Sequence, residues 1–102
     1  MPENHKWQVG FRNKAKKQCG KIPTNILAAV DALVVDLKSE GPERINWPHY
    51  GKIVDRDGLH HCHLNKGRPC YVAIWKVLDK TKQKMEIIYV GTHENANYRR
   101  IN

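Results

Sequence analysis

The sequence is poor in cysteine and in long apolar runs. Its three cysteines, Cys19, Cys62 and Cys70, are odd in number and form no CxxC pair, which argues against a disulfide framework and favours reduced thiols. Even the longer apolar runs are short, as at residues 26–30, whereas a helix needs roughly 20 apolar residues to span a bilayer. The N-terminal segment MPENHKWQVGF lacks a core of signal-peptide length. We therefore predict a cytoplasmic protein without a membrane segment.

Motifs for nucleotide binding and for nucleophilic catalysis are also missing. Neither GxGxxG nor GxxxxGK[ST] occurs, so a dinucleotide-binding fold or a P-loop is excluded in practice. The single serine, Ser39, falls at the end of a predicted helix, and Cys62 is expected to face the core. A protein nucleophile needs an oriented base beside it, and the sequence indicates none. We predict no cofactor.

Length and charge narrow the remaining classes. A chain of 102 residues has room for one domain with a modest core, predicted over residues 6–98 between tails 1–5 and 99–102. It carries 18 lysines and arginines against 10 acidic residues, a formal net charge of +8. Such a surplus attracts polyanions, so nucleic acid is the first expected partner and an acidic protein the second. A well-solvated basic surface is the alternative.

Two helices and a strand are predicted in the first 42 residues. Residues 6–11 alternate between apolar and polar side chains, the period of a half-buried strand. Asn13 is a plausible N-cap for a short helix over residues 14–19, which Gly20 should end in the left-handed conformation.

The second helix is the clearest element of the sequence. It should begin at Pro23 and Thr24 and end before Gly41 and Pro42, because proline suits a first helical turn and glycine a position just past the last. Its apolar residues recur at helical spacing and form one stripe: Ile26, Leu27, Val30, Leu33, Val34 and Leu37. This stripe is expected to pack on a sheet.

Three strands are predicted in the second half of the chain, near residues 59–64, 70–77 and 85–92. Residues 59–64 alternate between two faces, residues 70–77 are rich in β-branched and aromatic residues, and short turns join the three strands, which is typical of hairpins. The order β-α-α-β-β-β predicts an α+β fold in which two helices pack on one face of a mainly antiparallel four-stranded sheet. The other sheet face is expected to be open.

A long irregular segment over residues 43–58 precedes these strands, and loops of this length are usually functional or mobile. Trp47 and Tyr50 could stack on bases, and Lys52 could meet a phosphate, so all three are candidates for binding RNA. For Trp47, anchoring of the loop to the core is the slightly favoured alternative.

The segment 60–63 holds three histidines and a cysteine, which suggests a metal site at first sight. Consecutive strand residues point to opposite faces, however, so at most two of them can share one ion. Cys70 or His93 could complete a zinc site, but no CxxC or HxxxH spacing supports it. We predict that no metal is bound. We also predict that His61 and His63 project together from the open face of the sheet.

Metal-independent cleavage of RNA suits these residues better. A base takes the proton of the RNA 2′-hydroxyl, an acid protonates the departing 5′-oxygen, and cations stabilise the phosphorane. Histidine can fill both proton roles near neutral pH, and arginine and lysine suit the phosphate. The candidates are His61, His63 and His93, with Lys66 and Arg68 in the turn between two strands. Each histidine alone is more often simply solvated, and the set carries the prediction.

The run HHCHLNKGRPCYVAIW followed by YVGTHENANY, with NWPHYGK upstream, resembles the RelE/ParE superfamily of bacterial type II toxin-antitoxin toxins. It is most similar to the RelE-type and HigB-type mRNA interferases, over about residues 7–98. The resemblance implies a compact antiparallel sheet with two N-terminal helices. It also implies cleavage of mRNA without a metal, usually in the ribosomal A site, and a cognate antitoxin that neutralises the toxin.

Carried over by position, the resemblance implies basic site residues at His61 and His63, a catalytic residue near His93 and a terminal aromatic at Tyr98. The family often has an arginine within its third strand, where this chain has the apolar residues 71–73, so Arg68 is the candidate replacement.

The partners implied are an acidic antitoxin, mRNA and the ribosome, with the toxin either a monomer or in a heteromeric complex with the antitoxin. Two alternatives stay open. ParE-type toxins inhibit DNA gyrase, although they generally lack the histidine set found here, and an inactive basic domain would only bind RNA or an acidic protein.

Overall fold

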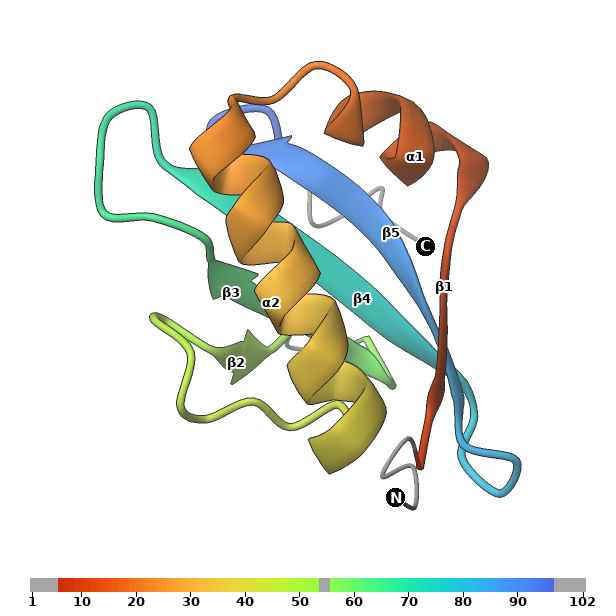
Figure 1. The fold of residues 1–102 in the computed structure, drawn as a ribbon. Helices are drawn as coiled ribbons and strands as arrows, with labels where there is room; N and C mark the ends of the chain where they lie inside the picture. Colours follow the sequence, from red (N-terminus) through yellow and green to blue (C-terminus); the bar gives the residue numbers. More distant parts are fainter. Residues whose placement is uncertain (1–5, 54–55, 97–102) are drawn as a thin grey trace, which may run out of the picture.

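The computed structural model describes residues 6–53 and 56–96, in which two helices pack against one five-stranded sheet (Figure 1). The strands lie in the order β1-β5-β4-β3-β2, with β1 parallel to β5 and the other neighbours antiparallel. The elements are β1 (Gln8–Phe11), α1 (Asn13–Cys19), α2 (Thr24–Glu40), β2 (Gly51–Lys52), β3 (Leu59–His63), β4 (Tyr71–Asp79) and β5 (Lys84–Thr92).

The predicted α+β class and the predicted element order are confirmed, with one addition. The sheet has five strands rather than four, because β2 forms within the segment predicted to be irregular. Strand β2 is only two residues long, and Gly51 and Lys52 pair with His61 and His60 of β3. A pairing this short leaves no alternation in the sequence, so only the position of β3 reveals it.

Helix α2 begins and ends where the sequence predicts. Pro23 precedes it in an extended conformation, and Gly41 follows it at φ 94°, where its N–H donates to the carbonyl of Leu37. A side chain larger than hydrogen is disfavoured at this φ. The buried stripe consists of Ile26, Val30, Leu33 and Leu37 and is narrower than predicted, because Leu27 is 36% exposed.

The predicted ends of α1 are wrong in two details. Asn13 is not the N-cap but the first helical residue, and Arg12 stands before it with no side-chain cap. The Arg12 guanidinium instead binds Glu86 of β5, at 3.0 Å. Gly20 has φ −73°, which is right-handed, since the chain tightens into a further turn in which its N–H donates to the carbonyl of Lys17. No left-handed glycine is needed there.

The core occupies both faces of the sheet, which corrects the expectation of an open far face. On the helix side, residues of α1 and α2 bury Cys62, Trp75 and Ile87 among others. On the far side Leu59, Val72, Ile74, Ile88 and Tyr89 form a second buried cluster. Ile88 and its neighbour Tyr89 both join this second cluster because the pairing of β4 with β5 shifts at this point. No helix among the described residues is long and apolar enough to cross a membrane.

Candidate functional site

A cavity of about 330 Å³ lies on the far side of the sheet, where β3 ends, β4 begins and β5 ends. Its lining combines imidazole, guanidinium, thiol and carboxylate groups from residues distant in the sequence: His63, Arg68, Pro69, Cys70, Thr92, His93 and Glu94. The strand register explains the meeting, because His63 pairs with Val72 and Val72 with Gly91, so one row of the sheet runs from the first histidine to the segment that carries the second.

His63 is the centre of this cavity. Its ring stacks on that of His49 with centroids 4.2 Å apart, and the ring of His93 meets it edge-on at 5.4 Å. Its Nδ1 lies 3.2 Å from the Sγ of Cys70. The backbone supports the arrangement, since the N–H of His63 donates to Pro48 and that of His93 donates to Cys70, both at 2.8 Å.

Two far-face histidines of β3, His61 and His63, are favoured in their neutral forms. Burial, and then the neighbouring His49, His93 and His61, lower the pKa of His63 below its ordinary value. The pKa of His61 is lowered in the same way, first by burial and then by His93 and His49. A lowered pKa leaves a histidine uncharged at neutral pH, which is the form that accepts a proton.

His61 and His63 share the far face, as the alternation of β3 predicts, but they do not share the cavity. His61 is opposite Ile74 and Gly51, and a Cβ added at Gly51 would lie 3.2 Å from its Nε2. It does not line the cavity, although it is close enough to His63 to lower its pKa. His93 lies close enough to both histidines to lower their pKa values, and His63 is the one whose ring contacts that of His93.

The two cations of the turn between β3 and β4 differ in position. Arg68 lines the cavity, so the guanidinium-bearing residue expected from the turn is at the site. Lys66 is exposed on the same turn and lies outside the lining. Tyr98, the predicted terminal aromatic, falls outside the described residues.

Trp47, Tyr50 and Lys52, predicted to bind RNA, are not brought to the histidine cavity. Trp47 packs on the helix-side core and donates its Nε1–H to Asp36 of α2 at 2.8 Å. The Tyr50 hydroxyl lies 2.7 Å from the Nδ1 of His60, and Lys52 pairs with Glu43 at 3.1 Å. These contacts lie on the helix side of β3, whereas Lys66 lies on the turn that also carries Arg68. The sheet therefore separates Lys66 from the other three residues predicted to bind RNA.

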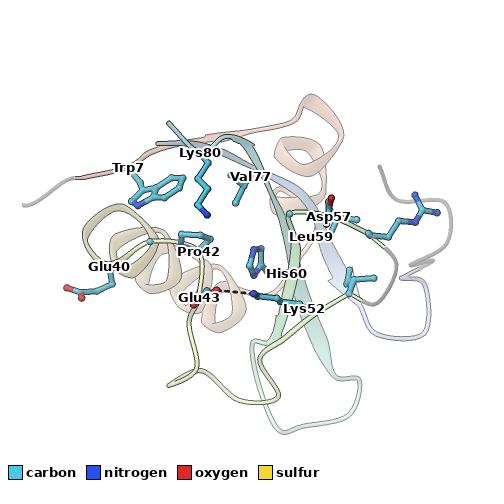
Figure 2. A pocket seen from close by; sticks show the side chains of 14 residues that line it. Trp7, Glu40, Pro42, Glu43, Lys52, Asp57, Leu59, His60, Val77 and Lys80 are labelled. Atoms are coloured by element: carbon cyan, nitrogen blue, oxygen red, sulfur yellow. Dashed lines mark ion pairs between the residues drawn. The ribbon is translucent and has the colours of Figure 1, made fainter. Parts of the chain in front are cut away.

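That side holds a larger cleft of about 1110 Å³, between the end of α2 and strand β3 (Figure 2). His60 projects into it and is only 4% exposed, stacked on Trp75, and burial lowers its pKa to about 4. The charged lining is balanced, with three cations and three carboxylates: Lys52, Arg56, Lys80, Glu40, Glu43 and Asp57. It therefore favours neither an anionic nor a cationic ligand.

Metal binding has no support in the geometry. Among the residues that the structure describes, no group of three or more histidine, cysteine or acidic side chains is arranged to hold an ion. Within the histidine-rich segment 60–63, the alternation of β3 sends His60 toward α2 and the neighbouring His61 toward the far face.

Solved structures show which fold this arrangement belongs to. A mutant of Escherichia coli RelE toxin in the free state is 17% identical, with 91% of this chain and 90% of that chain covered and a TM-score of 0.70. A chain of the archaeal RelE-RelB complex from Pyrococcus horikoshii is 15% identical, with 89% of this chain and 99% of that chain covered and a TM-score of 0.67. A chain of the Mycobacterium tuberculosis toxin-antitoxin complex RelBE2 is 24% identical, with 93% of this chain and 100% of that chain covered and a TM-score of 0.62.

This chain has the RelE fold. The similarity spans nearly the whole described chain and nearly the whole of each solved toxin, so the expectation drawn from the sequence resemblance is confirmed for the fold. No protein-family model and no curated protein sequence matches the chain. On this RelE fold the histidine cavity lies at the end of β5, formed by residues that hairpin pairing brings together.

Three ionisable residues at the site were not predicted as site residues from the sequence: Cys70 and Glu94 line the cavity, and His49 stacks on His63. His49 belongs to an irregular segment and has a positive φ of 54°, so no periodicity locates it. Cys70 precedes β4 and was considered from the sequence only as a possible zinc ligand, and Glu94 lies in the turn after β5. A usable signal for Cys70 existed: it follows the hairpin turn that His63 precedes, and diagonal neighbours across a hairpin are within reach of each other's side chains.

Proposed function

We propose that this chain is the toxin of a toxin-antitoxin pair and that it cuts mRNA without a metal. The observation that carries the proposal is the meeting of His63 and His93, 5.4 Å apart, in a cavity that Arg68 also lines. Two imidazoles and one guanidinium are sufficient for cleavage by the RNA's own 2′-hydroxyl, because no protein nucleophile takes part.

In this mechanism His63 is the base, since its lowered pKa leaves it neutral at pH 7. It takes the proton of the 2′-hydroxyl, and the 2′-oxygen attacks the adjacent phosphorus. His93 protonates the departing 5′-oxygen, and Arg68 offsets the charge of the phosphorane. The products are a 2′,3′-cyclic phosphate and a 5′-hydroxyl end. His61, on the neighbouring row, helps to position the RNA. Lys66 binds the flanking phosphate, and Tyr98 contacts the nucleotide.

The partners follow from the same proposal. The solved neighbours include complexes of RelE with RelB, which supports a cognate antitoxin for this chain. The net charge of +8 favours an acidic antitoxin and the polyanions mRNA and ribosome. We assign the toxin to a domain over residues 6–98 and to the cytoplasm.

Cleavage by purified protein tests the mechanism. His63→Ala and His93→Ala should each lower the rate about 10²- to 10⁴-fold on a ribosome-bound message, as removal of a general acid or base commonly does. Lys82→Gln, in the distant hairpin, is the matched control and should cut at the rate of the wild type. A message with 2′-deoxyribose at the scissile position should not be cut, and EDTA should have no effect.

The outcomes separate the alternatives. Cleavage that persists at the deoxy position, or that EDTA abolishes, would remove the 2′-hydroxyl mechanism. If neither free nor ribosome-bound RNA is cut while DNA gyrase loses supercoiling activity, the chain is a gyrase inhibitor instead. Growth arrest relieved by a co-expressed acidic neighbour protein would support the antitoxin.

A further inference from the structure

Cys70 is a free thiol that the proposed mechanism does not use, although it lines the same cavity as His63 and His93. Its Sγ lies 3.2 Å from the Nδ1 of His63, which is short for a hydrogen bond to sulfur. Each neutral imidazole has one N–H and one bare nitrogen, and the contact made at Nδ1 decides which is which. The role of the thiol therefore depends on where its own proton lies.

A second acceptor is available for that proton. The Sγ of Cys70 is 3.5 Å from the carbonyl oxygen of Asn65 and 3.9 Å from that of Tyr71. If the thiol donates to Asn65, its lone pairs are left to accept from the Nδ1–H of His63. The opposite arrangement, with the thiol donating to Nδ1, would place the imidazole proton on Nε2 and remove the base.

The surroundings hold this geometry. The Asn65 side chain accepts from the N–H of Tyr71 at 2.7 Å and donates to the carbonyl of Pro69 at 3.3 Å, so the turn that carries Cys70 is fixed. The backbone carbonyl of Cys70 accepts a hydrogen bond from the backbone N–H of His93 at 2.8 Å. His49 covers one face of the His63 ring, which limits its rotation.

We propose that Cys70 is a positioning residue that accepts a hydrogen bond from the Nδ1–H of His63 and so leaves Nε2 bare for the substrate. The thiol does not touch the substrate in this proposal. It acts through His63 as an oriented outer partner acts on a histidine ligand. The inference rests on the proposed function for its consequence in catalysis, but the tautomer itself can be measured without any substrate.

Nitrogen-15 NMR of labelled protein at pH 8, where His63 is neutral, tests the tautomer. Wild-type His63 should carry its proton on Nδ1. Cys70→Ala should move it to Nε2, the form preferred by histidine in water, and Cys70→Ser should keep it on Nδ1. Cys19→Ala removes a thiol far from the cavity and should resemble the wild type. A wild-type proton on Nε2, or an unchanged tautomer in Cys70→Ala, overturns the proposal.

Kinetics add a second readout. Cys70→Ala should lower kcat about 10- to 100-fold with little change in KM, and Cys70→Ser should restore most of the loss. Equal impairment of both variants would show that volume, not hydrogen bonding, is what matters, and would overturn the proposal. If the wild type cuts no RNA, the proposed function fails while the NMR result still decides the role of Cys70.

Discussion

Neighbouring histidines of β3 have unlike surroundings, and their chemistry differs accordingly. His60 is sealed between Tyr50 and Trp75 on the helix side, with its ring parallel to that of Trp75 within 6°. His63, three residues on, lines an open cavity beside His93. Burial of this kind penalises the charged form, so His60 is expected to serve stability, whereas His63 is expected to exchange protons.

The stability of the protein should fall in mild acid because of His60. Its pKa is about 4 in the folded state and near 6.5 when unfolded, so between these values the unfolded chain binds the proton and the folded chain does not. The stabilisation is fully present above pH 6.5 and decreases by about 3 kcal/mol as the pH falls to 4. Urea unfolding from pH 7 to pH 4 measures it.

His60→Gln is the matched variant for this measurement, since it keeps a polar side chain but cannot titrate. It should be less stable than the wild type at pH 7, and its stability should depend on pH by about 3 kcal/mol less. His61, His63 and Glu43 have lowered pKa values too and are present in both proteins. Parallel curves for the two proteins would contradict the assignment to His60.

Among the elements, the segment between α2 and β3 has the most to explain. The sequence predicts base stacking for its aromatic residues, with anchoring to the core as the favoured alternative for Trp47, and in the structure Trp47 and Tyr50 both pack on the core. The Trp47 indole binds Asp36 of α2, and Tyr50 packs against His60 and Trp75. These contacts fix the segment so that Pro48 and His49 reach His63 at the cavity. The segment therefore helps to position His63.

Trp47→Phe tests this anchoring role. The phenyl ring keeps most of the packing but loses the hydrogen bond to the Asp36 carboxylate, which should cost about 1.5 to 3 kcal/mol in the free energy of unfolding. A double-mutant cycle with Asp36→Asn should show that the two losses are not additive. Binding of RNA to folded Trp47→Phe should match the wild type. A large loss of RNA affinity with unchanged stability would restore the stacking role.

Across the whole molecule, the sheet separates the larger core from the histidine cavity. The face toward the helices carries the larger core and a cleft of balanced charge, and the far face carries the histidine cavity and the turn with Lys66 and Arg68. The proposed RNA site therefore lies on the far face, beside the cations of that turn. The opposite end of β4 carries another basic hairpin, with Lys80, Lys82 and Lys84, and serves as an internal comparison.

Salt dependence distinguishes these two ends. Affinity for a 2′-O-methyl RNA, which cannot be cut by the 2′-oxygen, should fall linearly on a log–log plot against salt concentration. Lys66→Gln should reduce the magnitude of that slope by about 0.7, the value for one phosphate contact on a single strand. Lys82→Gln should leave the slope unchanged, as fluorescence titrations can show. Equal effects of the two variants would indicate diffuse attraction by net charge.

The elements themselves were largely predictable. Alternation in β3 places His61 and His63 on one face, and the pattern from Pro23 to Gly41 delimits α2, because both depend on periodicity and on the backbone preferences of single residues. The two-residue strand β2 and the shift that places Ile88 and Tyr89 on one face were not predictable, because each is defined by a partner strand.

The sequence by itself determined the fold class, the separation of His60 from His61 and His63, and the residue types available for phosphate chemistry. Only the tertiary structure decided which of them meet: His63 with His93, His49 and Cys70, and Arg68 at the same cavity. The physical reason is that periodicity fixes the direction of a side chain along its own element, whereas distances between elements depend on register, on loop anchoring and on packing. Trp47 and Lys52 face the helix side for that reason, and His49, which no pattern marked, reaches the cavity.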